Sequence, residues 1–207
     1  MNYDRIHALH RDALIKKHRS FLENKALLEF GVYHGTSMLM WYDLYRQNGL
    51  ERNFIGFDSF QGLPKETEDK NTIWKEKQFS TDGKVNPNLN KSGIRLVTGF
   101  YSDSLNESAA RLLSEQKVGL VHVDCDTYSS TKIILEWLLK HNLLTRGTLV
   151  VYDDWGAHLE ARCGEYEVGE GKAHKEIEFK YDINFIDLGK YIVDPKFYEV
   201  KVFEYQR

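Results

Sequence analysis

The feature that most limits how this chain folds is a series of short apolar runs that alternate with helical patterns. Five such runs end in glycine or aspartate: 26–32, 54–58, 94–98, 118–123 and 148–152. Short apolar runs bounded by turn residues are typical of buried strands. Strands alternating with helices predict an α/β fold, with a mostly parallel sheet covered by helices on both faces.

The helical patterns and the C-terminal strands complete this prediction. Apolar residues at helical spacing predict helices over 3–22, 37–47, 104–115, 127–141 and 169–180. The last predicted strands, 184–187, 191–193 and 198–205, have no long helix between them. Because parallel strands need a long crossover, we expect an antiparallel C-terminal edge.

Composition excludes several classes of protein. The 207 residues, 42% of them hydrophobic, can bury one core, so 1–207 is predicted to be a single domain. The net charge of -3, without a basic run, argues against nucleic acid as a partner. There is no apolar run long enough for a membrane span and no signal-peptide pattern. Two cysteines, Cys125 and Cys163, form no disulfide framework, so a cytoplasmic location is expected.

The first candidate site is the glycine turn that follows the first strand. Ligands of parallel sheets bind outside the carboxyl ends of the strands. Gly31 and Gly35 allow a backbone to approach a ligand closely, although an ordinary tight turn uses the same residues. Their G-x-x-x-G spacing differs from the dinucleotide fingerprint G-x-G-x-x-G. Asp58, at the end of the second strand, is suited to accept hydrogen bonds from the ribose hydroxyls of an adenosine, or else caps the next turn.

Four aspartates at two neighbouring strand ends form the second candidate site. Asp124 and Asp126 follow the fourth strand, and Asp153 and Asp154 follow the fifth. Carboxylates this close repel one another, and a divalent cation relieves that repulsion. Oxygen ligands favour Mg²⁺, Mn²⁺ or Ca²⁺. We expect Asp124, Asp153 and Asp154 to bind the metal and Asp126 to cap the helix that begins at Thr127.

Two further patterns carry less weight. Tyr128 and Lys132 match the Y-x-x-x-K motif of short-chain dehydrogenases, but the dinucleotide fingerprint is missing, so we interpret them as helix residues. His158, just beyond Asp154, is a candidate base, and a solvated loop histidine explains it equally well.

At this point five ordered motifs resemble those of the macrocin O-methyltransferase family, which methylates sugars on macrolide antibiotics. They are LEFGVYHGTS at 28–37, GFDSFQGLP at 56–64, GFYSDSL at 99–105, DCDTYSST at 124–131 and VVYDDW at 150–155. The resemblance implies a Rossmann-like class I methyltransferase fold with a seven-stranded sheet. It also implies S-adenosylmethionine as methyl donor and Mg²⁺ as metal. A carbohydrate-containing small molecule would be the acceptor, with segments 61–92 and 156–175 as acceptor-side loops and 1–24 as a leading helix.

The same resemblance assigns residues to roles. Asp124, Asp153 and Asp154 would bind the metal, and Asp124, Asp126 and His158 are the candidate catalytic groups. The donor would contact Glu29, Gly31, Tyr33, Gly35, Thr36, Ser37, Asp58, Ser59, Gly99, Phe100 and Asp124.

Some positions depart from the pattern and leave alternatives open. Residues 156–172 differ from the usual family continuation, and Thr127 stands where catechol-type methyltransferases place a lysine base. A catechol-like or phosphorylated acceptor, a nicotinamide-dependent oxidoreductase and a non-catalytic binding protein therefore stay open, as does a homo-oligomer.

Overall fold

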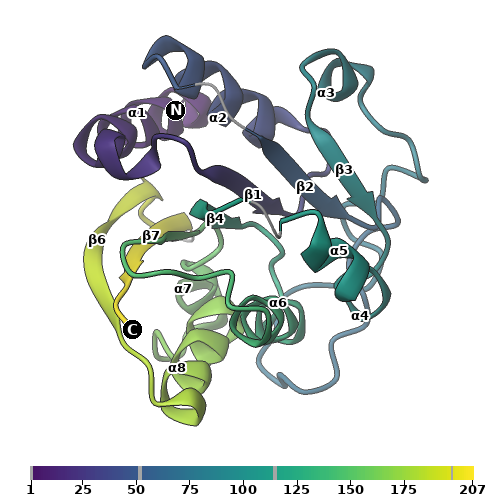
Figure 1. Cartoon of the computed structure of the whole chain (residues 1–207). Helices are drawn as coiled ribbons and strands as arrows, with labels where there is room; N and C mark the ends of the chain where they lie inside the picture. The colour runs from purple at the N-terminus through teal and green to yellow at the C-terminus, as the bar shows by residue number, and fades with distance from the viewer. Residues whose placement is uncertain (1, 51–52, 114–115, 197) are drawn as a thin grey trace.

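A seven-stranded sheet forms the centre of the molecule (Figure 1). The computed structural model describes residues 2–50, 53–113, 116–196 and 198–207. The strand order is β3-β2-β1-β4-β5-β7-β6, in which β1 to β5 run parallel and β7 runs antiparallel to both neighbours. The strands are β1 Ala26–Phe30, β2 Phe54–Asp58, β3 Arg95–Thr98, β4 Val118–Val123, β5 Leu149–Tyr152, β6 Phe185–Asp194 and β7 Tyr198–Tyr205.

Helices cover both faces of the sheet, with α1 and α2 on one face and α6 and α8 on the other (Figure 1). Because both faces are covered, every residue of β1, β4 and β5 is buried, which explains their continuous apolar runs. The helices are α1 Tyr3–Leu22, α2 Thr36–Gln47, α3 Pro87–Lys91, α4 Tyr101–Ser104, α5 Glu107–Arg111, α6 Tyr128–Lys140, α7 Ala157–Ala161 and α8 Gly169–Tyr181.

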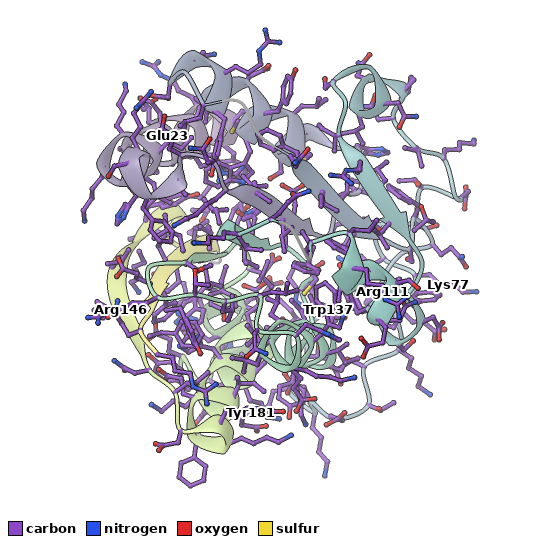
Figure 2. All side chains as sticks on the ribbon, in the orientation of Figure 1. Glu23, Lys77, Arg111, Trp137, Arg146 and Tyr181 are labelled. Carbon is purple, nitrogen blue, oxygen red and sulfur yellow. The ribbon has the colours of Figure 1, made fainter. Side chains whose placement is uncertain are left out.

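Each face has its own apolar core. On the α1 and α2 face, Ile15 and Trp41 are fully buried against the sheet. On the opposite face, Trp137 of α6 packs edge-on against Phe30 and Phe57 (Figure 2). The predicted mostly parallel, seven-stranded sheet with an antiparallel C-terminal edge and helices on both faces is confirmed.

Three details of the predicted elements were wrong. The single helix expected over 104–115 is two short helices, because the Asn106 side chain accepts hydrogen bonds from the amides of Ser108 and Ala109 and starts a new helix there. Residues 114 and 115 lie outside the described residues. The two strands expected over 184–193 are one strand, β6, whose register shifts between Asp187 and Gly189.

The third detail concerns the start of α6. Thr127, and not Asp126, caps this helix, because its Oγ1 accepts a hydrogen bond from the Ser130 amide at 3.3 Å. Asp126 has a φ of 65°, which turns the chain before the helix begins. Among the residues described, no helix is both long and apolar enough to cross a membrane.

Candidate functional site

A cavity of about 570 Å³ lies at the carboxyl ends of the parallel strands. All five of these strands reach its wall, through Gly31 after β1, Asp58 of β2, Gly99 after β3, Asp124 after β4 and Asp153 after β5. Helix α1 and the segment between β2 and α3 supply other parts of the wall. The ends of parallel strands therefore form a binding site, as in other open α/β sheets.

The glycine turn lies directly against the end of β4. Gly31 has a φ of 94°, and a Cβ atom at this position would lie 1.6 Å from the Asp124 carbonyl oxygen. Only glycine fits such a contact. The close approach brings the first turn of α2 and the aspartates after β4 to the same side of the cavity.

Asp58 fastens this turn to the end of β2. Its Oδ2 accepts hydrogen bonds from the amides of Val32 and Tyr33, both at 2.7 Å, and its Oδ1 accepts one from Phe60 at 2.6 Å. A carboxylate has about four lone-pair sites, so acceptor capacity is left toward the cavity. Asp58 therefore orders the turn and can also accept ligand hydroxyls.

The four predicted aspartates meet at one wall of the cavity. Val123 of β4 lies beside Tyr152 of β5, so Asp124 and Asp153 follow at neighbouring positions. Burial raises the pKa of Asp124, Asp126 and Asp154 well above the usual range, and the neighbouring carboxylates raise it further. The protein alone therefore does not compensate the negative charge of these three groups.

Asp153 is different, because three side chains donate hydrogen bonds to it. Arg11 of α1 and His122 of β4 contact its Oδ1 at 3.2 and 3.1 Å, and the Tyr198 hydroxyl contacts its Oδ2. Although burial opposes ionisation, the hydrogen bond from His122 and the charges of His122 and Arg11 hold the pKa of Asp153 well below its usual range.

His122 joins Asp153 to a second buried carboxylate, Glu29 of β1. Its Nδ1 lies 3.2 Å from Glu29 Oε2, and the ring is completely buried. Burial and the charge of Arg11 favour the neutral ring, but the hydrogen bonds with Asp153 and Glu29 raise the pKa of His122 to about 9. Sequence reasoning missed this residue, for which the only signal was a histidine inside the apolar run of β4.

The residues at this wall fit a divalent cation. Oδ2 of Asp154 is buried without a hydrogen-bond partner. Ligand atoms of His122, Asp124 and Asp153 lie within 4.8 Å of one another. Since both ring nitrogens of His122 face carboxylates and its pKa is raised, we interpret it as a hydrogen-bond donor and not as a ligand. The oxygen atoms of Asp124, Asp153 and Asp154 remain as the donor set, which suits a hard cation.

The comparisons with known proteins identify the family. A family profile described as a methyltransferase domain matches residues 28–155, more than half of the chain. The chain belongs to this methyltransferase family. It is an S-adenosylmethionine-dependent enzyme, which overturns the oxidoreductase and non-catalytic alternatives. No curated protein matches the chain in sequence.

Solved structures agree with this assignment. The calicheamicin methyltransferase CalS11 is 20% identical with a TM-score of 0.70, over 99% of this chain and 80% of CalS11. The O-methyltransferase NovP is 18% identical with a TM-score of 0.70, over 98% of this chain and 80% of NovP. PaMTH1 from Podospora anserina is 17% identical with a TM-score of 0.55, over 96% of this chain and 79% of PaMTH1. At these identities the similarity shows the fold, and the predicted class I methyltransferase fold is confirmed.

Most residues predicted for the site of the methyltransferase line its cavity. They are Gly31, Tyr33, Thr36, Ser37, Asp58, Ser59, Gly99, Phe100, Asp124, Asp126, Asp153 and Asp154. Three predicted residues do not line it. Glu29 lies beneath the turn against His122, and Gly35 packs near Leu89. His158 is buried in α7, where its Nδ1 contacts the Trp155 carbonyl oxygen at 2.8 Å.

Proposed function

We propose that the protein is a Mg²⁺-dependent O-methyltransferase that transfers the methyl group of S-adenosylmethionine to a hydroxyl of a sugar or sugar-containing metabolite. The observation that carries this proposal is the position of the carboxylates of Asp124, Asp153 and Asp154, which share one cavity with the glycine turn and Asp58. Such an arrangement puts a donor site and a cation site within the same enclosed space.

The donor site is proposed along the first three strand ends. Asp58 would accept the ribose hydroxyls, since it lines the cavity and retains free lone pairs. Gly99 and Phe100 would border the adenine, and the first turn of α2 would face the methionine part. Glu29 would support this end through His122 rather than by direct contact, because it lies outside the cavity wall.

For the metal, Asp124, Asp153 and Asp154 are the proposed ligands. When bound, a divalent cation lowers the pKa of an acceptor hydroxyl and orients it. The chain itself holds these ligands in place: Arg11, His122 and Tyr198 position Asp153 through hydrogen bonds. The buried carboxylate of Glu170 accepts a hydrogen bond from the Asp154 amide at 3.0 Å.

The proposed reaction is an in-line transfer. The acceptor oxygen attacks the methyl carbon, the C–S bond breaks, and its electron pair remains on sulfur to give S-adenosylhomocysteine. The hydroxyl proton passes to a carboxylate, for which Asp124 and Asp126 are the candidates because both line the cavity. Positioning of the two reactants supplies much of the rate, on the order of 7 to 11 kcal/mol. His158 is not retained as a base, since it does not reach the cavity wall.

The charge of the wall favours an unphosphorylated acceptor. Arg11 is the one lysine or arginine among the described lining residues, and it is already paired with Asp153. The acidic lining residues are Asp4, Asp58, Asp124, Asp126, Asp153, Asp154 and Glu160. A divalent cation and the donor add three positive charges, which leaves an excess of negative charge that opposes a phosphate.

The acceptor class rests on two further observations. CalS11 is a TDP-rhamnose 3'-O-methyltransferase, which supports a sugar. Parts of both predicted acceptor-side loops line the cavity, including Leu63 and Trp74 from 61–92 and Ala157 from 156–175. Aromatic contacts of Phe79 with Tyr33 and Trp74 favour a second candidate, a catechol-like ring, since aromatic side chains stack on both kinds of acceptor.

A transfer assay tests the proposal. Labelled S-adenosylmethionine is incubated with glycosides, sugar nucleotides and catechols, with Mg²⁺ or with a chelator. We expect transfer to an unphosphorylated glycoside that stops with the chelator and in Asp154→Asn. The same variant should bind S-adenosylhomocysteine within about 3-fold of the wild type, because the donor site is intact. Asp182→Asn, an exposed acid after α8, is the matched control. Full transfer by Asp154→Asn in the presence of chelator would contradict the metal-dependent proposal.

A further inference from the structure

The methyl donor carries one negative charge, and the methyltransferase has one basic group of fixed charge in its cavity wall. S-adenosylmethionine has a carboxylate, an ammonium and a sulfonium group, so a carboxylate-rich wall attracts its cations and repels its carboxylate. Arg11 is the only Lys or Arg in the described part of that wall. Electrostatics therefore favours a binding position for the donor carboxylate beside Arg11.

The guanidinium of Arg11 is held in place at this point. It is 3% exposed and lies over the Trp41 ring, with its central carbon 4.7 Å from the ring centroid. Nη1 donates to Ser37 Oγ at 2.9 Å, and Nη2 donates to Asp153 Oδ1 at 3.2 Å. Nε is buried without a hydrogen-bond partner. Since buried donors are normally satisfied, Arg11 has capacity for one more acceptor.

The start of α2 provides further donors beside Arg11. Its N-cap is Gly35, which offers no side-chain acceptor, and the amides of Thr36 and Ser37 in the first helical turn have no intrahelical acceptor. Both residues line the cavity. A helix N-terminus attracts anions, and here the buried, partly unpaired guanidinium adds an independent reason for an anion to bind.

We infer that Arg11, together with Ser37 and the first turn of α2, binds the α-carboxylate of the methyl donor and makes an intact amino-acid end a requirement for donor binding. The inference rests on the proposed donor orientation, with the adenosine at Asp58. Because Arg11 also contacts Asp153, the carboxylate position and the metal-binding wall share one side chain. Helix α1 thereby becomes part of the donor site.

The test compares two ligands that differ in one group. Calorimetry measures the affinity for S-adenosylhomocysteine and for its decarboxylated analogue, 5'-(3-aminopropylthio)adenosine, in wild type, Arg11→Met and Arg11→Lys. In the wild type we expect the carboxylate to tighten binding by about 10- to 100-fold, the range for a hydrogen bond to a charged group. In Arg11→Met the two ligands should bind with nearly equal affinity, and Arg11→Lys should recover part of the difference.

The ratio of the two affinities separates binding from structural effects. A variant that only distorts the site would weaken both ligands and keep their ratio. Arg46→Met, on the exposed face of α2, is the control and should keep the wild-type ratio. An unchanged ratio in Arg11→Met, or a wild-type ratio near one, would overturn the inference. If the wild type bound neither ligand, the proposed donor itself would be wrong. Because the wild-type ratio needs no variant, the inference is falsifiable even if Arg11→Met does not fold.

Discussion

The buried imidazole of His122 makes the stability of this protein depend on pH in a defined range. Its pKa is raised from 6.5 to about 9 because Asp153 and Glu29 accept hydrogen bonds from the ring. A raised pKa means that the folded state binds the proton more tightly than the unfolded chain does. The stabilisation is therefore complete below pH 6.5 and is lost as the pH rises toward 9.

The size of this effect follows from the shift. A difference of about 2.5 pKa units corresponds to about 3 kcal/mol in the free energy of unfolding. His122→Gln keeps a hydrogen-bonding side chain but cannot take up this proton. The wild type should therefore be more stable than His122→Gln at pH 6, and its advantage should shrink by about 3 kcal/mol by pH 9.5.

Urea unfolding at pH 6, 7.5 and 9.5 with a chelator present measures this difference, and the chelator removes any contribution from bound metal. His174→Gln is the matched control. Burial lowers the pKa of His174 to about 3, so this ring is neutral in the folded protein throughout the range. Its variant should run parallel to the wild type from pH 7.5 to 9.5. A constant difference between wild type and His122→Gln would refute the assignment of a charged imidazole.

Two more substitutions test the site. Gly31→Ala should lower the free energy of unfolding by more than about 3 kcal/mol, because its Cβ would lie 1.6 Å from the Asp124 carbonyl oxygen. Gly83→Ala, which has a φ of 75° but open space around the Cβ, should cost only about 1 to 2 kcal/mol, and equal losses in thermal melts would refute the steric argument. Asp58→Asn should weaken S-adenosylhomocysteine binding about 10-fold, since the neutral amide is a poorer acceptor for ribose hydroxyls and turn amides. Unchanged affinity by calorimetry would remove Asp58 from the donor site.

Much of the fold was predictable because burial on both faces leaves a clear record in the sequence. Continuous apolar runs predicted the central strands, and the absence of a helix before the last strand predicted the antiparallel edge. Local details were less predictable. Asn106 and Thr127 both act as helix caps, and cap geometry depends on which of several adjacent polar residues has the extended backbone.

The sequence by itself determined which groups come to the cavity from the strand ends. Parallel strands end on one edge of the sheet, so Gly31, Asp58, Asp124 and Asp153 had to meet once the strands were identified. Order along the chain was enough for this, because each strand end is adjacent to its functional residue.

Only the tertiary structure decided how these groups are charged. Arg11 lies 142 positions from Asp153 in the chain, and His122 lies 93 from Glu29, yet each pair is in contact. These contacts depend on the packing of α1 and on the side of β4 that His122 faces, and no local pattern records either. The network ionises Asp153 and leaves Asp124 and Asp154 uncompensated, so the packing of a distant helix determines the electrostatics of the proposed metal site.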